Sequence, residues 1–268
     1  MKKLLLVSML FCWLTACFQS KKTTSLQQNI NVEDHQIFAV LFQQHAAEYR
    51  ALCYQAFNCA RIVLASEIVT HKGAKPLAVI SDIDETLLDN SPELADRIIR
   101  NIPYSHEHWL KWTMHEKRAK ALPGAVEFLK YADSMNIKIF YISNRTEEEK
   151  AATIDNMKNL GFPQLDATSF LLKSVDKSSS DKELRRQTVL LTHDIVLLLG
   201  DNLGDFISAK LPISRRNELA DSLKATWSLK NIVLPNPCYG GWEEAIRLFK
   251  NNLTKSQIDS LRRNALIR

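Results

Sequence analysis

Five short apolar runs recur along the chain, and segments with helical spacing separate them. Runs without polar interruptions are typical of parallel strands that are covered on both faces. Strands that alternate with helices predict an α/β fold, in which a doubly wound parallel sheet carries helices on both faces. The five expected strands cover residues 77–80, 137–143, 169–173, 195–200 and 231–234.

The segments between these runs predict helices. Apolar residues at helical spacing from Asp34 to about His71 indicate one long or once-broken helix. Residues 91–120 predict two helical segments with a break at Asn101-Ile-Pro103, so a small helical cap, about residues 90–121, is inserted after the first strand. Further helices are expected after Pro123-Gly124, after capping boxes at Thr146–Glu149 and Ser180–Glu183, and over residues 243–251 and 254–267. We therefore expect one α/β domain over residues 34–268.

The first 33 residues do not follow this pattern. A basic start, a short apolar stretch and small residues before a cysteine indicate a signal peptide over residues 1–16. Leu14-Thr-Ala-Cys17 resembles the lipobox of bacterial lipoproteins, which implies acylation of Cys17; the alternative is a plain signal peptide with an incidental cysteine. Several acyl chains would anchor the protein through a polar tether, residues 17–33, to a membrane of the cell envelope. Phe18 in place of an aspartate favours the outer membrane.

The composition, 46% hydrophobic and 24% charged residues, is that of an ordinary globular protein. The formal charge of +5 falls to +3 when Lys2 and Lys3 leave with the signal peptide, which is too weak to indicate a nucleic-acid partner. Cys53, Cys59 and Cys238 remain beyond the lipobox, and we expect buried thiols and no disulfide framework.

The first apolar run ends at Asp82 and Asp84, two carboxylates separated by one residue. Like charges this close repel each other unless a cation or a shared proton holds them, and a divalent metal is the simplest explanation. An ionised aspartate beside a hard cation can attack phosphorus, while a second carboxyl passes a proton to the leaving oxygen. The alternative is an exposed acidic turn, against which the preceding apolar strand and the later Asp201 and Asp205 argue.

Other polar groups follow other elements. Ser143 ends the second strand, Lys182 lies in the first turn of an expected helix, and Asp201 and Asp205 follow the fourth strand. Because ligands collect at the carboxyl ends of parallel strands, we expect these groups to meet at one edge of the sheet. Carboxylate oxygens there suit Mg²⁺, a serine can donate to a phosphoryl oxygen, and a lysine can neutralise its charge. The alternatives for the lysine are Lys173 and Lys177.

With these groups in place, the sequence resembles the haloacid-dehalogenase (HAD) superfamily, whose four motifs have this order. More narrowly it is similar to the class C acid phosphatases, the lipoprotein e family of 5′-nucleotidases. The match rests on the lipobox, Asp82-Ile-Asp-Glu-Thr86 and Gly200-Asp-Asn-Leu-Gly-Asp-Phe206, with support from residues 122–128, 141–145 and 234–242. It covers nearly the whole mature chain and implies a HAD-like fold.

By this resemblance Asp82 is the nucleophile that forms an aspartyl-phosphate, and Asp84 is the general acid and then the general base. Spacing alone does not separate these two roles. The resemblance also implies Mg²⁺-dependent hydrolysis of small phosphomonoesters, with nucleoside monophosphates as expected substrates. The phosphate ligands would be Ser143 and Lys182, and the metal ligands Asp82, the Asp84 carbonyl and Asp201, with Asp205 in support.

Three aromatic residues are candidates for contact with the nucleoside base, because related class C enzymes hold the base with aromatic residues from the cap and the last loop. Trp109 and Trp112 lie three apart on one helix face, a stripe that more often belongs to the core. Tyr239 precedes Gly240-Gly241, which allow close approach of a ligand. The family signature usually has a tyrosine where this chain has Glu93, which leaves substrate preference open.

Two alternative functions stay open at this point. One is a broad acid phosphatase or phosphotransferase without base selectivity. The other is a non-catalytic surface lipoprotein that binds a ligand such as haem through the histidines and tryptophans of residues 106–115. That function would predict a damaged acidic site, whereas all the acidic residues are present. The oligomeric state, with a homodimer as one alternative, does not follow from the sequence.

Overall fold

The computed structural model describes residues 34–173 and 180–268. The expected signal peptide, the lipobox with Cys17, the tether and Lys177 lie outside the described residues. None of the helices that the structure describes is long and apolar enough to cross a membrane.

The core is a five-stranded parallel sheet in the order β5-β4-β1-β6-β7. From the central β1 the chain winds outward to β4 and β5 on one side, and then crosses back to β6 and β7 on the other. The winding changes direction between β1 and β6, which is where open α/β sheets bind their ligands. The doubly wound sheet and all five expected strands are thereby confirmed. The strands are β1 (Leu77–Ser81), β4 (Lys138–Thr146), β5 (Phe170–Lys173), β6 (Asp194–Gly200) and β7 (Asn231–Val233).

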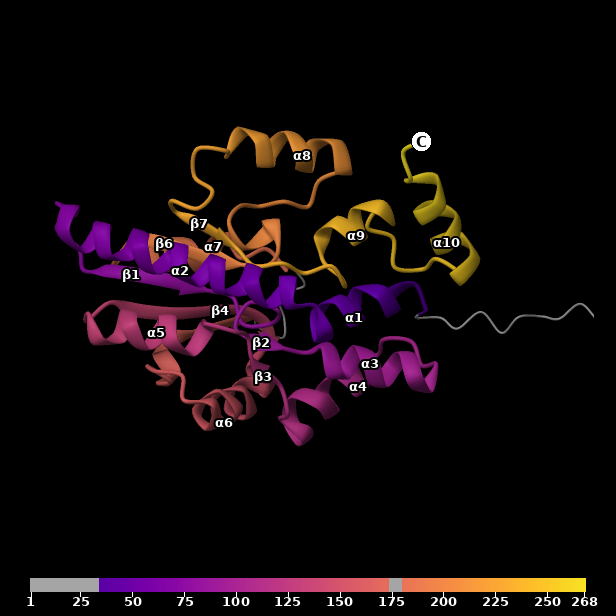
Figure 1. Cartoon of the computed structure of the whole chain (residues 1–268), viewed down its shortest axis with the longest axis horizontal. Coiled ribbons are helices and arrows are strands. Elements are labelled where there is room, and N and C mark those ends of the chain that lie inside the picture. The colour runs from indigo at the N-terminus through magenta and orange to yellow at the C-terminus, as the bar shows by residue number, and fades with distance from the viewer. Residues whose placement is uncertain (1–33, 174–179) are drawn as a thin grey trace, which may run out of the picture. The chain divides into compact units, whose positions relative to one another are not determined.

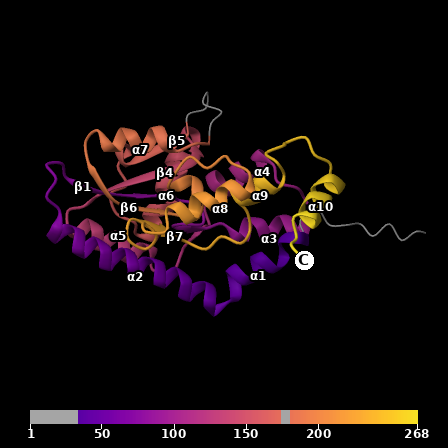
Figure 2. The same ribbon diagram turned by 90° about the horizontal axis from the view of Figure 1, so that it is seen from above.

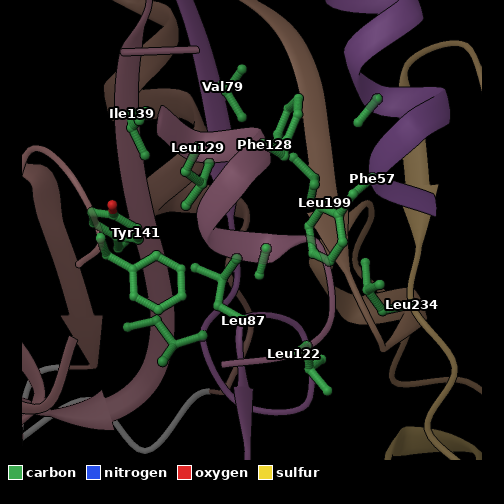
Figure 3. Close-up of a cluster of buried hydrophobic side chains, with 14 of the residues drawn as sticks. Phe57, Val79, Leu87, Leu122, Phe128, Leu129, Ile139, Tyr141, Leu199 and Leu234 are labelled. Carbon is green, nitrogen blue, oxygen red and sulfur yellow. The ribbon is translucent and has the colours of Figure 1, made fainter. Parts of the chain in front are cut away.

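Side chains of the strands alternate between two buried clusters. Val79 and Leu199 belong to the larger cluster, which Figure 3 shows between the sheet and the helices that cover it. Ile80 and Leu198, their neighbours in sequence, belong to a second cluster on the opposite face. Because both faces are covered, the strands consist of continuous apolar runs.

Helices cover both faces, and Figure 2 shows α7 on the side of the sheet away from α2 and α5. The larger cluster receives Phe57 from α2, Phe128 from α5 and Met157 from α6, whereas α7 contributes Val189 to the second cluster. The helices are α2 (Ala47–Thr70), α5 (Ala125–Ser134), α6 (Lys150–Leu160) and α7 (Glu183–Leu190). The long N-terminal helix is broken once, as expected, because Ala46 is extended between α1 (Ile37–His45) and α2.

The expected helical cap follows β1. Two short antiparallel strands, β2 (Leu88–Asp89) and β3 (Lys120–Ala121), pair at its base. Between them lie α3 (Ser91–Arg100), α4 (His106–Leu110) and the π-helical segment η2 (Lys111–Glu116). Asn101 ends α3 in a left-handed conformation, so the break falls where it was expected. Figures 1 and 2 both show α3 and α4 at the end of this domain that α1 also occupies.

Three helices in the second half depart from expectation. The capping box at Ser180–Glu183 is wrong: Asp181 accepts the backbone N–H of Glu183 at 2.8 Å, so α7 begins at Glu183 and Lys182 is its N-cap residue. The helix α8 (Ile213–Ser222) was not expected, because Arg216 is the one residue it buries and it has no apolar stripe. The helix α9 (Gly241–Ile246) stops before Asn251, since Leu248 and Phe249 take positive φ. By contrast, α10 (Lys255–Asn264) begins with the expected Thr254–Gln257 capping box.

Four short 3-10 turns complete the secondary structure of the described residues, and the first of them precedes α1. The capping box at Thr146–Glu149 is confirmed, and it opens a 3-10 turn that leads into α6. The turns are η1 (Asp34–Gln36), η3 (Glu147–Glu149), η4 (Ala167–Ser169) and η5 (Leu203–Asp205).

Candidate active site

Three aspartates meet where β1 and β6 end. The backbone N–H of Asp82 donates to the carbonyl of Leu199 at 2.9 Å, which continues the pairing of the two strands to the first aspartate. Asp201 follows the last residue of β6, and Asp205 ends the turn η5. One carboxylate oxygen from each of Asp82, Asp201 and Asp205 lies within 4.8 Å of the others. The structure therefore brings together the two acidic strand ends that the sequence predicted.

Gly200 makes this approach possible. A Cβ atom at Gly200 would lie 2.3 Å from the Cβ of Asp205, a distance that no real pair of such atoms adopts. The turn itself is held by Asn202, whose backbone N–H donates to Oδ2 of Asp205 at 2.8 Å. The other carboxylate oxygen of Asp205, Oδ1, accepts from Lys182.

Lys182 enters the same cluster from the start of α7. Its ammonium group lies 2.5 Å from Oδ1 of Asp82 and 2.6 Å from Oδ1 of Asp205, and the lysine is only 5% exposed. This contact selects Lys182 over Lys173 within the described part of the chain.

The cluster is electrostatically unbalanced. Burial raises the pKa of Asp82 well above its ordinary value, and the charges of Asp205 and Asp201 raise it further against the opposing effect of Lys182. Burial, followed by the charge of Asp205, raises the pKa of Asp201 to about 7. For Lys182, burial works against the charged form, but Asp205 and Asp82 outweigh it and raise its pKa. Three carboxylates thus face a single firmly charged ammonium group.

A divalent cation fits this set of donors. Full ionisation of the three carboxylates against one ammonium would give the cluster a net charge of −2, and burial makes that charge costly unless a cation binds. Thr86 and Asn236 donate to Asp201 at 3.1 and 2.8 Å, so that this carboxylate is already oriented. All the donors are hard oxygens, which suit a cation such as Mg²⁺ or Ca²⁺ and not a thiolate metal.

Asp84 lies beside the cluster, but its carboxylate is held differently. Arg145 contacts both oxygens, with Nη2 at 2.8 Å and Nε at 3.1 Å from Oδ1 and Nε at 3.2 Å from Oδ2. Asn90 donates to Oδ1 at 2.8 Å, and Ser143 lies 3.4 Å from Oδ2. The carboxylate of Asp84 is not among the three that converge as cation ligands in the described residues. Asp82 and Asp84 therefore have separate surroundings.

Glu85 is the third acidic residue of this loop, and it is completely buried. Its backbone is in the left-handed region, with φ of 53°, which is uncommon for a residue other than glycine. Its carboxylate accepts from the backbone and side chain of Asn90 and from the hydroxyl of Tyr239. Burial, and then the charge of Asp84, raises the pKa of Glu85 well above its ordinary value.

The three aromatic candidates have different positions. Trp112 is only 4% exposed and belongs to the large core cluster, where its indole N–H donates to Asn90, so it presents no open face to a base. Trp112 thus has the position of a core residue, which is the alternative given for this stripe, and its contact with a base stays a prediction. Trp109 is partly buried, lies over the guanidinium of Arg145 at 5.6 Å and donates to Glu149. Tyr239 is half-buried, with its hydroxyl on Glu85.

Sequence reasoning missed the groups that surround Asp84. Arg145 enters the sequence analysis only as part of a matching segment, because the predicted strand ends at Ser143, whereas β4 continues through Arg145 to Thr146. No local signal marks Asn90 or Glu85, whose contacts depend on how the cap folds back. Glu93, the departure from the family signature, is buried on α3 between Arg97 at 2.9 Å and His108 at 3.0 Å.

Comparisons with known proteins found relatives both in sequence and in structure. The family model for the acid phosphatases of HAD superfamily subfamily IIIB matches residues 14–242. The crystal structure of the class C acid phosphatase from Bacillus anthracis with tungstate bound is 36% identical, has a TM-score of 0.85, and is matched over 89% of this chain and 99% of that one. A second structure of the class C acid phosphatase from that organism has the same identity and coverage and a TM-score of 0.84.

A curated plant protein is more distantly similar. Acid phosphatase 1 of Solanum lycopersicum is 24% identical over 163 residues, which are 60% of this chain. The match spans 57% of that relative's length, less than two thirds of it.

Proposed function

This chain belongs to the acid phosphatases of HAD superfamily subfamily IIIB, within class C, and we propose that it hydrolyses small phosphomonoesters with Asp82 as the nucleophile and Mg²⁺ as the cofactor. The observation that carries the proposal is the convergence of Asp82, Lys182, Asp201 and Asp205 at one edge of the sheet. Tungstate, a tetrahedral oxyanion like phosphate, is bound in the solved relative, which supports an oxyanion site here.

The first step uses both aspartates of the β1 loop. An oxygen of Asp82 forms a bond to phosphorus as the ester bond to the leaving oxygen breaks, and the proton of the Asp84 carboxyl passes to that oxygen. In the second step Asp84 takes a proton from water, the water oxygen attacks phosphorus, and the bond to Asp82 breaks. Free phosphate leaves, Asp82 is ionised again, and Asp84 carries a proton for the next turnover.

The other groups of the site hold charge and position. Lys182 contacts Asp82 before substrate arrives, so it stabilises the ionised nucleophile and can shift to a phosphoryl oxygen as charge moves there. Ser143 is buried, with its hydroxyl 3.4 Å from Oδ2 of Asp84, and it can donate to a phosphoryl oxygen of a substrate bound beside Asp84. A bound Mg²⁺, held by Asp82, Asp201 and the Asp84 carbonyl with Asp205 in support, would offset the negative charge of the phosphoryl group.

For the substrate we propose nucleoside 5′-monophosphates. The half-buried ring of Tyr239 supports this choice, because its hydroxyl is fixed by Glu85 within the loop that carries the nucleophile. A base stacked on such a ring would gain about 1–3 kcal/mol, which a substrate without a base would lack. A broad acid phosphatase would show no such preference.

Phosphate release from a panel of monophosphates, with and without Mg²⁺ and chelator, tests this function. The panel pairs nucleoside 5′-monophosphates with a small aryl phosphate and an alkyl phosphate. We expect hydrolysis of all three classes, loss of activity with chelator and recovery with Mg²⁺. Equal specificity constants across the panel would leave a phosphatase without base selectivity, and full activity in chelator would contradict the metal.

For localisation we propose that the enzyme is attached to a bacterial outer membrane by acylation of Cys17. The support comes from the lipobox and from Phe18, which lie outside the described residues. Substitution Cys17→Ser should release the protein from the membrane fraction, and the wild type should incorporate labelled palmitate. Unchanged fractionation of the variant would contradict the anchor. Cys59→Ser, which leaves the lipobox intact, is the matched control.

A further inference from the structure

Asn90 is completely buried at the start of α3, between the loop that carries Asp84 and the cap. Asparagine is favoured at this N-cap position because its side chain usually accepts from the first turn of the helix. Here the side chain makes no such bond, and Asp89 instead accepts the backbone N–H of Ser91 at 2.9 Å. The amide of Asn90 is therefore turned away from its own helix.

The Asn90 amide connects two carboxylates of the loop after β1 to the cap. Its Nδ2 donates to Oδ1 of Asp84 at 2.8 Å and to Oε2 of Glu85 at 3.3 Å. Its Oδ1 accepts from the indole nitrogen of Trp112 at 2.9 Å, and an indole N–H can only donate. If the amide were flipped, its oxygen would face the carboxylates of Asp84 and Glu85, and its nitrogen would face the indole N–H of Trp112; both arrangements are unfavourable. The surroundings therefore allow one orientation.

The two oxygens of Asp84 are consequently unequal. Oδ1 accepts from Asn90 and from both Nη2 and Nε of Arg145, all within 3.1 Å. Oδ2 has longer contacts, with Nε of Arg145 at 3.2 Å and with Ser143 at 3.4 Å. Arg145 also favours Oδ1, because its Nη2 donates to Oδ1 at 2.8 Å while its Nε is nearly equidistant from the two oxygens. Asn90 is on Oδ1 alone.

We propose that Asn90 is a positioning residue for the acid and base group: it holds Oδ1 of Asp84 so that Oδ2 faces the leaving oxygen, and Trp112 links this orientation to the cap. The inference rests on the proposed function, in which Asp84 gives a proton to the leaving group. Ser143, a candidate phosphate ligand, lies on the Oδ2 side, so the oxygen left open is the one nearest the reacting group.

Leaving-group dependence tests this role, because an alkoxide needs a proton as it departs and a nitrophenolate does not. The measurement is kcat/KM of Asn90→Ala for an alkyl phosphate and for p-nitrophenyl phosphate, with the melting temperature of each protein. A positioned acid contributes about 10²–10⁴-fold, so we expect the alkyl substrate to lose at least about tenfold more than the aryl substrate. Equal losses, or none, on the two substrates would overturn the proposal.

Trp112→Phe provides the second variant, since it keeps an aromatic ring in the core and removes the N–H that Asn90 accepts together with the second ring of the indole. We expect the same selective loss at smaller amplitude, and an unchanged ratio would remove the link to the cap. Thr113→Val is the matched control: the hydroxyl of Thr113, a buried cap residue, donates to Glu149 at 3.0 Å and to the carbonyl of Trp109, so the substitution spares the hydrogen bonds of Asn90, and the ratio should stay that of the wild type.

Asp84→Asn separates this inference from the proposed function. If Asp84→Asn itself shows no leaving-group dependence, the acid role of Asp84 fails. If Asp84→Asn is selective and the Asn90 and Trp112 variants are not, only the positioning role fails.

Discussion

The acidic cluster of Asp82, Asp201 and Asp205 surrounds its carboxylates differently from the junction beneath the cap, which is formed by Asp84, Asn90 and Arg145. Asp82 and Asp84 belong to different regions although one residue separates them. In the cluster, Asp82, Asp201 and Asp205 share a single ammonium group and repel one another. In the junction, Asp84 is matched by donors of Arg145 and Asn90. An excess of charge prepares a site for a cation and a phosphoryl group. Matched donors instead fix the direction of one group. Environment therefore assigns the two roles that spacing leaves undivided.

The largest expected effect comes from removing the nucleophile from the cluster. Asp82→Asn should reduce phosphate release to background, because an amide cannot form the bond to phosphorus. The variant should still fold, since Asp205 remains to pair with Lys182. Activity near that of the wild type would eliminate Asp82 as the nucleophile. Asp155→Asn, at an exposed aspartate paired with Lys117, is the control and should keep full activity.

The second effect falls on the junction. Asp84→Asn should lower kcat by about 10²–10⁴-fold through the loss of proton transfer. Its carboxylate is outside the three that converge, so Mg²⁺ affinity measured by calorimetry should stay close to that of the wild type. Asp201→Asn should weaken the same affinity instead. A marked loss of Mg²⁺ binding in Asp84→Asn would show that the two regions are not separate.

The smallest effect concerns Tyr239, in the loop after β7, whose hydroxyl contacts Glu85. Tyr239→Ala should raise KM for nucleoside monophosphates by about 5–150-fold, the equivalent of about 1–3 kcal/mol of stacking. Hydrolysis of a small aryl phosphate should change little, because the phosphate and metal groups are untouched. Loss of Glu85's hydroxyl partner will also lower stability, so the melting temperature is measured in parallel. Equal loss on both substrates would reject the stacking role.

The two regions also differ in how well the sequence predicts them. The cluster follows from local patterns, since Asp82 and Asp201 come directly after continuous apolar strands, Asp205 follows four residues later, and parallel strands end at one edge. The sequence places Lys182 at the start of a helix, although the expected capping box of Ser180 is absent and Asp181 accepts the backbone N–H of Glu183 instead. These features depend on a few neighbouring residues, which is why they can be derived without coordinates.

The junction depends on contacts between distant segments. Asn90 meets Trp112 across the cap, and Arg145 reaches Asp84 from another strand. No periodicity predicts such pairs. The strands β2 and β3 have two residues each, too few to form a pattern, and α8 lacks an apolar face because its buried residue is Arg216. Trp112 shows the same limit, since helical spacing does not tell whether a stripe faces the core or a ligand.

The central claim is that phosphate is transferred to Asp82. It is tested most directly by mixing enzyme and substrate, quenching in acid, and reducing the trapped acyl-phosphate with borohydride, which converts a phosphorylated aspartate to homoserine. Peptide mass spectrometry then locates the change. We expect homoserine at position 82, dependent on substrate and absent when Asp82→Asn is used. Homoserine at another aspartate, or none at position 82 under conditions of active turnover, would contradict the account.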